Sequence, residues 1–356
     1  MNRTFYLLLF LFISLSGCFK DQSGHIPTDT YGNSRGGMDP VDSILQNLPP
    51  TNEVLIINKG IPGSSNGTIT LFKPQPRTVT NDWFFDVNNT SLGDLPHSIT
   101  KHNNQLFITV TGSDKLEVVD PQTFISLNTI DLPIAPTHFL AITPSIVYIT
   151  GDSLSVYDLD SMKTINVIGF SSAPSQMVLA GEKVFVLIKG SDQLVSLDAT
   201  NDSIIDTINL VTGANSIAQD LKNKIWVLSD GGNMIATPAL QRLDIEGDFV
   251  EMTLSFPSIS DSPHDLSSVK RSSDLYFLNG DIFRINMNSN SLPIDPIAFA
   301  ENRSYSAIEV HPIDRFIYAA DTSLRPANGW VYIHNPSGKL VDSLEAGVVP
   351  FDFFMK

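Results

Sequence analysis

The residue types that could do chemistry recur at one place in a repeated sequence motif. The motif is a proline or its substitute, two variable residues and an apolar residue. Its variable positions hold three of the seven histidines, His97, His138 and His264. Other variable positions carry hydroxyl, amide, carboxyl and aromatic side chains: Ser98, Thr137, Ser175, Gln176, Asn215, Ser216, Asp265, Ser306, Phe351 and Asp352. Such groups around one concavity suit a large polar ligand with some apolar surface.

We expect ligand contacts from residues at and beside these positions: His97, His138, Gln176, Asn215, His264, Asp265, Tyr305, Phe351, Arg325 and Trp330. Tyr305 replaces the proline of one motif copy, and Arg325 lies in the long segment 321–329 that Trp330 follows. For each residue taken alone, a structural role is an equal alternative. A narrow channel needs small and polar residues for packing and hydration, and tight hairpin turns need Gly, Asn and Asp.

Catalytic and metal chemistry find little support in the sequence. The single cysteine, Cys18, excludes an internal disulfide and a thiolate zinc site, and the histidines form no HExxH pair. The chain contains no Gly-x-Ser-x-Gly elbow and no CxxCH haem attachment. Three histidines facing one channel leave a divalent metal or an acid–base pair as an alternative, but no acidic pair is spaced with them. We therefore expect no enzyme activity, no catalytic residue, no metal and no covalently bound cofactor.

The net charge argues against one class of partner, and the chain length bears on the number of domains. The chain of 356 residues has 22 Lys and Arg against 38 Asp and Glu, a net charge of −16, which repels a phosphate backbone and argues against nucleic acid as a partner. A folded body of about 300 residues is near the size at which one hydrophobic core stops growing. The chain is therefore expected to split into domains or to repeat its core.

Repetition is visible in the hairpins. Residues 105–120 and 183–198 both read as an apolar run, a Gly-Ser-Asp turn and an alternating run that ends in Asp. This pattern is typical of two antiparallel strands joined by a turn. No helix is expected from residue 51 onward, because no apolar stripe at helical spacing lasts more than two turns. Trp83 is expected in an outer strand of the first repeat, and Trp226 in a second strand.

The spacing of the motif predicts the fold. Its seven copies begin at residues 96, 136, 174, 214, 263, 305 and 350, so the steps are 40, 38, 40, 49, 42 and 45 residues. A period near 40 to 45 built of strands predicts an all-β, seven-bladed β-propeller with four strands per blade. The last copy has no hairpin after it, and the first hairpin, from Val54, has no motif before it. Pairing of the C-terminal strand with the N-terminal blade closes the ring, which an open solenoid or two β-sandwiches would not explain.

The N-terminus carries the pattern of an exported lipoprotein. Residues 5–15 are almost entirely apolar and follow Arg3, but the run is too short to span a bilayer, which needs about 20 residues. The sequence Leu15-Ser16-Gly17-Cys18 then resembles a lipobox. We expect a signal peptide over 1–17, lipidation of Cys18, a flexible tether over 18–50 and the propeller over 51–356. The protein is then held at the outer membrane by lipid alone, exposed at the cell surface.

Several segments together resemble a known group of proteins. They are residues 53–60, 63–69, 92–94, 117–124, 215–217, 224–232, 317–321, 329–332 and 346–350. The hairpins resemble YVTN or YncE-like propellers. Over residues 52–354 the chain resembles the BtuG-type surface lipoproteins of that superfamily, which bind cobalamin and cap an outer-membrane TonB-dependent transporter.

The resemblance implies a function. It implies capture of cobalamin or another corrinoid at the channel mouth and transfer of the ligand to a TonB-dependent transporter. The proline of the motif is replaced at Ala214 and Tyr305, a departure that bears on the ligand more than on the fold. The alternatives are a propeller that binds another small molecule, a glycan or a protein, and a lactonase-like or lyase-like enzyme.

Overall fold

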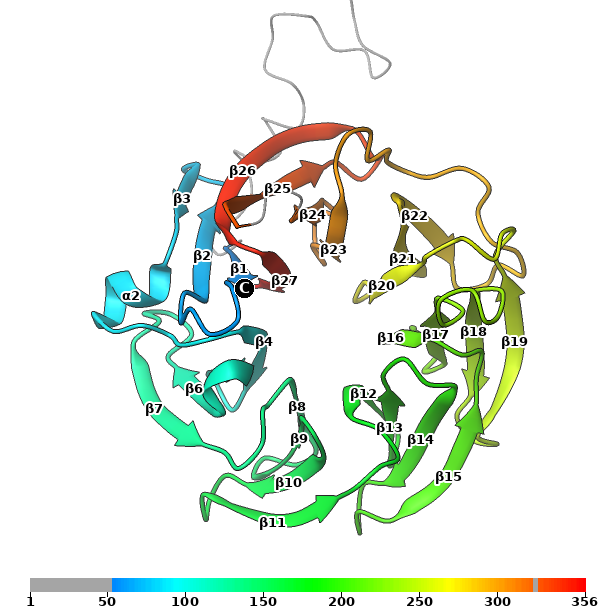
Figure 1. Ribbon diagram of the computed structural model, residues 1–356, viewed down its shortest axis with the longest axis horizontal. Coiled ribbons are helices and arrows are strands. Elements are labelled where there is room, and N and C mark those ends of the chain that lie inside the picture. Colours follow the sequence, from blue (N-terminus) through cyan, green and yellow to red (C-terminus); the bar gives the residue numbers. More distant parts are fainter. Residues whose placement is uncertain (1–52, 323–325) are drawn as a thin grey trace, which may run out of the picture. The chain divides into compact units, whose positions relative to one another are not determined.

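The protein folds as a ring of sheets. The computed structural model describes residues 53–322 and 326–356, and the strands in these ranges form seven sheets around a common centre (Figure 1). The predicted seven-bladed β-propeller is therefore confirmed. The predicted signal peptide 1–17, Cys18 and the tether 18–50 lie outside the described residues.

The blades are numbered here from the one that contains both chain ends. The first blade holds β27 (Pro350–Met355), β1 (Val54–Asn58), β2 (Thr68–Lys73) and β3 (Thr78–Thr80). The second blade holds β4 (Pro96–His102), β5 (Gln105–Val110), β6 (Lys115–Val119) and β7 (Ser126–Asp131). The third holds β8 (His138–Ala141), β9 (Ile146–Thr150), β10 (Leu154–Asp158) and β11 (Lys163–Ile168). The fourth holds β12 (Pro174–Ala180), β13 (Lys183–Ile188), β14 (Gln193–Asp198) and β15 (Ile204–Asn209). The fifth blade holds β16 (Ala214–Gln219), β17 (Ile225–Ser229), β18 (Ala239–Asp244) and β19 (Phe249–Ser255). The sixth holds β20 (His264–Ser268), β21 (Asp274–Asn279) and β22 (Asp281–Asn286). The seventh holds β23 (Tyr305–Val310), β24 (Ile317–Asp321), β25 (Asn328–His334) and β26 (Leu340–Val348).

The burial of each strand follows its place in the blade. Second strands such as β1 and β17 are buried at every residue, because neighbouring blades cover both of their faces. The outer strand β7 buries one residue, Ile130, and exposes most of the others. The core is accordingly divided into clusters between adjacent blades. One such cluster joins Leu55 and Ile57 of the first blade to Leu106 and Ile108 of the second.

Two details depart from the expected pattern. A short helix, α2 (Trp83–Asn88), and a single turn of 3-10 helix, η1 (Thr111–Ser113), interrupt the strands. Trp83 therefore begins a helix, and its expected place in an outer strand was wrong; Phe84, the next residue, packs against Phe124 of the second blade. The second departure is the sixth blade, which has three strands in the described residues. Its edge strand β22 is met by backbone hydrogen bonds between Ile282 and Ala298.

The ring closes as predicted. β27 pairs antiparallel with β1, with Phe353 opposite Ile56 and Met355 opposite Val54. Strands from the two ends of the described chain thus share one sheet (Figure 1). An ion pair between Lys356 and Glu53 fastens the end of this pairing.

Asn58 joins the first blade to the seventh. Its side-chain amide donates to Thr68 Oγ1 at 3.1 Å and to Thr70 Oγ1 at 2.9 Å, and its Oδ1 accepts from the Gly347 N–H at 3.0 Å. Asn58 is fully buried, so without it the Gly347 N–H would lose its side-chain acceptor and Thr68 Oγ1 its donor, while Thr70 Oγ1 would keep its bond to Asn81.

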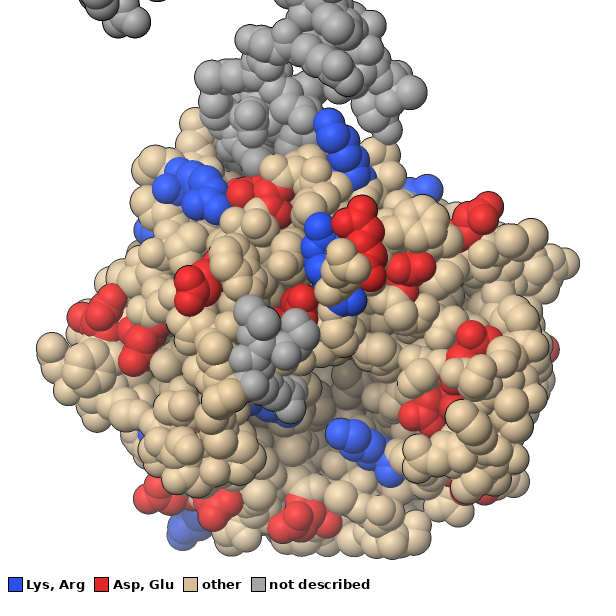
Figure 2. Space-filling model, turned by 45° about the horizontal axis from the view of Figure 1, so that its top comes forward, with Lys and Arg blue, Asp and Glu red and all other residues tan. Residues whose placement is uncertain are grey.

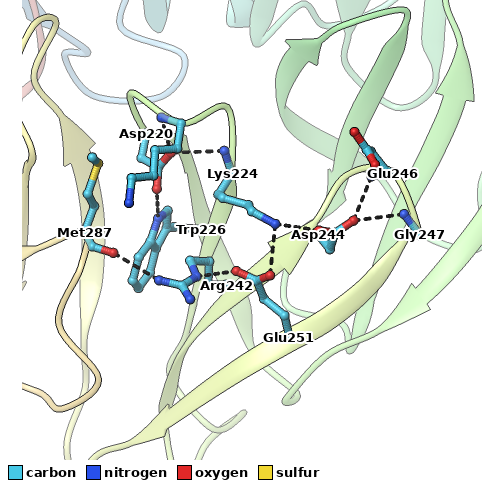
Figure 3. Close-up of polar contacts among 10 residues, drawn as sticks. Asp220, Lys224, Trp226, Arg242, Asp244, Glu246, Gly247, Glu251 and Met287 are labelled. Atoms are coloured by element: carbon cyan, nitrogen blue, oxygen red, sulfur yellow. Dashed lines mark hydrogen bonds and ion pairs between the residues drawn. The ribbon is translucent and has the colours of Figure 1, made fainter.

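A polar network holds the fifth blade to the sixth (Figure 3). Trp226 is fully buried in β17, as expected for a second strand, and its Nε1 donates to Asp220 at 2.9 Å. The Arg242 guanidinium lies 5.4 Å from the Trp226 ring centroid and donates to the Met287 carbonyl beyond β22. The Glu251 carboxylate forms ion pairs with both Arg242 and Lys224 within the fifth blade.

We predict that Asn58→Ala lowers the free energy of unfolding by about 2–4 kcal/mol, because it leaves the buried Gly347 N–H without its acceptor and removes the donor to Thr68 at the closure. Urea unfolding followed by circular dichroism measures the change. Asn128→Ala, at an exposed position of β7, is the matched control and changes stability by less than about 0.5 kcal/mol. Equal effects of the two substitutions would contradict this role for Asn58.

Candidate functional site

One cavity lies at the end of the channel where the inner strands begin. Its volume is about 550 Å³, and side chains from all seven blades line it. Of the thirteen expected mouth positions, twelve line this cavity, and Ser98 lines a second cavity of about 270 Å³ that shares His138, Gln176 and Asp352 with the first. Figure 2 shows a hollow near the centre of the ring with a lysine or arginine side chain at its edge. The lining residues are His97, Thr111, Ala135, Thr137, His138, Gly151, Asp152, Ala173, Pro174, Ser175, Gln176, Lys189, Asn215, Ser216, His264, Asp265, Ser306, Phe351 and Asp352.

A bulge at the start of the inner strands positions the variable side chains. The register of β4, β12, β16, β20 and β23 against their second strands shifts within the motif. A bulge leaves backbone groups unpaired and aims side chains away from the regular sheet direction. Asp265 takes the left-handed conformation here, with φ of 56°, which Asp tolerates better than most residues.

The variable side chains of one blade satisfy the backbone of the next. Gln176 Oε1 accepts from the Ile217 N–H at 2.9 Å, and Ser216 Oγ accepts from the Leu266 N–H at 3.1 Å. Asp265 Oδ2 accepts from the Ile308 N–H in the same way. These bonds link the fourth, fifth, sixth and seventh blades in turn. They fix the lining side chains in place, since each of these acceptors is tied to the neighbouring blade.

An aromatic group forms one wall of the cavity. The His97 ring lies edge-on to His138, with centroids 4.8 Å apart, and edge-on to Phe351 at 4.9 Å. Lys59, in the turn after β1, places its Nζ 3.1 Å from the centroid of the Phe351 ring. This His97, His138, Phe351 and Lys59 group is called the histidine wall below.

Both imidazoles of the histidine wall are neutral near pH 7. Burial, followed by the positive charges of Lys59 and Lys189, lowers the pKa of His138 to about 3. Burial also lowers the pKa of His97 well below its usual value, with smaller effects of His138 and both lysines. The physical cause is the same in both rings: a positive imidazolium would be desolvated beside two ammonium groups.

Three carboxyl groups form a second cluster, called the carboxyl wall below; Asp265 and Asp352 line the cavity, and Glu309 does not. Asp265, Glu309 and Asp352 stand on the inner strands β20, β23 and β27, which are consecutive around the ring. Burial raises the pKa of Asp265 to about 7 and that of Asp352 to about 7. Burial, with repulsion from Asp352 and Asp265, raises the pKa of Glu309 to about 8. Near pH 7 this carboxyl wall therefore holds protons and can donate as well as accept hydrogen bonds.

Two further expected residues are tied to backbone carbonyls. His264 places Nδ1 3.0 Å from the Ser262 carbonyl and Nε2 3.4 Å from the Tyr305 carbonyl. Asn215 donates to the Pro263 carbonyl at 2.8 Å. Both line the cavity while they bridge adjacent blades.

Three expected residues do not join the cavity lining of the described chain. Tyr305 is buried, and its hydroxyl lies 2.9 Å from His334 Nε2 within its own blade; its expected place at the mouth is corrected. Trp330, on β25, stacks against Tyr332 with centroids 6.5 Å apart and lies outside the lining. Arg325 is outside the described residues.

Three charged residues were missing from the expected site. Lys59 and Lys189 lie in hairpin turns, where their residue types alone point to no particular partner. Glu309 did leave a signal in the sequence. It occupies the fifth position of the motif, where the other copies have Thr, Leu, Val, Ala, Ser or Phe.

The described residues contain neither a candidate metal site nor a candidate membrane-spanning helix. Within them, no three His, Cys, Asp or Glu side chains are grouped so that they could hold a metal ion. No helix in the same ranges has the length and apolar character needed to cross a membrane.

We predict a pH-dependent effect of Asp352→Asn on stability. The folded state keeps the proton of Asp352 up to a pKa of about 7, whereas an unfolded Asp loses it near pH 4, so folding binds a proton between these values. The carboxyl therefore weakens the wild type as pH rises through this window. The variant should gain about 1 kcal/mol relative to the wild type between pH 5 and pH 8, a figure reduced for solvent at the open cavity.

Urea unfolding at several pH values measures this difference. Asp131→Asn, at an exposed position of β7, is the matched control for the same change of side chain. A difference between Asp352→Asn and the wild type that stays constant with pH would refute the raised pKa.

Comparisons with known proteins agree with the fold. The model of the family described as domain of unknown function DUF5074 matches residues 52–344. No curated protein matches the sequence.

Solved structures with the same fold have low identity. A quinonprotein alcohol dehydrogenase-like protein from Bacteroides thetaiotaomicron is 12% identical, with a TM-score of 0.68 over 86% of this chain and 78% of its own. A functionally unknown protein from Desulfotomaculum acetoxidans is 10% identical, with a TM-score of 0.64 over 85% and 98%. The dihydro-heme d1 dehydrogenase NirN, in complex with DHE, is 9% identical, with a TM-score of 0.55 over 87% and 76%. At these identities the likeness shows the fold alone.

Proposed function

We propose that this chain, which belongs to the DUF5074 family, binds a small ligand at the channel mouth. The proposed ligand is cobalamin or another corrinoid. The description of the family assigns no function, so the proposal starts from the site itself. The observation that carries the proposal is the convergence of all seven blades on one lined cavity of about 550 Å³. That volume is typical of small-molecule sites, which run from about 300 to 1,000 Å³.

The chemistry of the walls suits an amide-rich ligand with a broad apolar face. Gln176, Asn215 and the carboxyl wall can donate and accept hydrogen bonds, as primary amides require. Phe351 and the imidazoles of His97 and His138 offer aromatic surface beside them. A corrinoid is larger than the cavity, so it would enter in part and lie across the mouth.

The histidine wall favours binding over acid–base catalysis by its imidazoles. A general base near pH 7 needs a pKa near 7, which Asp265 and Asp352 have and His138, at about 3, does not. The rings of the histidine wall are therefore poor proton acceptors for a lactonase or lyase. We propose a ligand-binding role without enzyme activity.

The location in the cell is part of the proposal. We propose that Cys18 is lipidated, that the lipid holds the protein at the outer membrane facing outward, and that a TonB-dependent transporter receives the ligand. These steps rest on the lipobox-like sequence and on the resemblance to surface lipoproteins. Co-purification of a β-barrel transporter would support the partner, whereas recovery of a host or matrix protein would favour an adhesive role.

We predict that the mature chain without its lipid, residues 19–356, binds cyanocobalamin, with heat in calorimetry and a change in its visible spectrum. Phe351→Ala should weaken binding about tenfold, because it removes the aromatic surface of the histidine wall. Phe249→Ala, at an exposed phenylalanine of β19, is the matched control. Absence of heat and spectral change with cyanocobalamin and with dicyanocobinamide would refute the proposed ligand.

We predict that Cys18→Ser moves the protein out of the membrane fraction, because the acylated residue is lost. Fractionation and incorporation of labelled fatty acid measure this. Ser23→Ala, a nearby substitution in the tether, is the control and should keep the protein at the membrane. Retention of the Cys18 variant at the membrane would contradict lipid anchoring.

A further inference from the structure

The histidine wall has polar atoms without protein partners. In the part of the chain that the structure describes, Nδ1 of His97 and Nδ1 of His138 are buried and make no hydrogen bond. Ser175 Oγ, on the next blade, is likewise buried and makes no hydrogen bond. All three residues line the cavity and come from the inner strands of three adjacent blades, β4, β8 and β12. Buried polar groups without partners are rare enough to need an explanation.

The buried nitrogens decide how the rings are protonated. A neutral imidazole carries its proton on one nitrogen and a lone pair on the other. A buried N–H without an acceptor is rarer than an under-satisfied acceptor. The proton of each ring is therefore assigned to Nε2, and Nδ1 keeps its lone pair. Nε2–H is then the donor that each ring can offer.

The charges around the cavity are divided between its walls. The ammonium groups of Lys59 and Lys189 act on both imidazoles, and Lys189 itself lines the cavity. The acidic residues that influence one another are Asp265, Glu309 and Asp352 of the carboxyl wall, and Lys59 also acts on Asp352. Asp152 adds a further carboxyl group to the cavity lining. An anionic group of a ligand is thus attracted to the histidine wall, where the two lysines supply positive charge.

We propose that the histidine wall, with Lys189 and Ser175, is an oxyanion subsite that takes a phosphate group of the ligand through neutral imidazole N–H donors. The carboxyl wall then takes the N–H donors of the same ligand, so the two walls orient it. The inference rests on the proposed function for the identity of the whole ligand, but the subsite can be tested without it. For a corrinoid, the group concerned is the phosphodiester of the nucleotide loop.

The first test compares two corrinoids. Cyanocobalamin carries the phosphodiester, and dicyanocobinamide has the same macrocycle without the nucleotide loop. Lys189→Met should weaken cyanocobalamin binding about tenfold and leave dicyanocobinamide binding unchanged, because a charge-assisted contact is lost. Lys189→Arg should retain the difference between the ligands. Lys163→Met, at an exposed lysine of β11, is the matched control and should change neither affinity.

The second test needs no corrinoid. In ¹⁵N-labelled protein, the ring nitrogens of His97 and His138 should show the Nε2–H form at pH 7. Inorganic phosphate should shift these resonances in the wild type and shift them less in Lys189→Met. Sulfate at equal ionic strength should act in the same way, because the proposed contact is to an anionic oxygen.

The outcomes separate the two proposals. If neither corrinoid binds but phosphate shifts the histidine resonances, the subsite stands and the proposed ligand falls. If both corrinoids bind and Lys189→Met weakens them equally, or changes neither, the proposed ligand stands and the oxyanion subsite is overturned. A ring that carries its proton on Nδ1, or a phosphate response absent from the wild type, overturns the subsite as well.

Discussion

The pairing of β27 with β1 is the contact on which the rest of the protein depends. It joins Pro350–Met355 to Val54–Asn58 and converts a row of sheets into a closed ring. Each blade then has a neighbour on both sides, so every second strand is covered on both faces and no blade needs a large core of its own. Closure also sets the width of the channel, because the number of blades decides how closely the inner strands approach. A cavity at the mouth follows from this geometry before any ligand is considered.

The lining side chains bond to the backbone of neighbouring blades and also form the surface of the cavity. The bulge at the start of an inner strand leaves a backbone N–H unpaired, and the side chain of the preceding blade accepts from it, as Gln176, Ser216 and Asp265 do. The polar character of the mouth is therefore partly required by the ring itself. This explains why residue type alone could not separate a packing role from a ligand role at these positions. In His97 and His138 the buried Nδ1 atoms without partners indicate how the rings are protonated, and the proposed ligand contact is made by Nε2–H.

The cavity is electrically divided although the chain as a whole is acidic. The net charge of −16 is that of the whole sequence and argues against a nucleic acid partner, yet Lys59 and Lys189 bring positive charge to the histidine wall. Burial acts on the two walls in opposite directions. It removes the proton that would charge an imidazole and retains the proton that neutralises a carboxyl. Both walls thus act near neutral pH mainly through hydrogen bonds, with the lysines providing the local positive charge.

The sequence by itself determined the number of blades, the closure and most of the mouth. Those features follow from a strand motif that repeats at a nearly constant step, so the same positions of each copy meet around one axis. Glu309 was missed, although a carboxyl at an otherwise apolar or hydroxyl position after the motif was a signal for it. The tertiary structure alone decided that Tyr305 turns into its blade, that Trp83 begins a helix and that Lys59 covers Phe351. Lys59 and Phe351 are almost 300 residues apart in the chain and meet only because the ring closes. The protonation of the walls was likewise out of reach of the sequence, since it depends on burial and on charges that other blades supply.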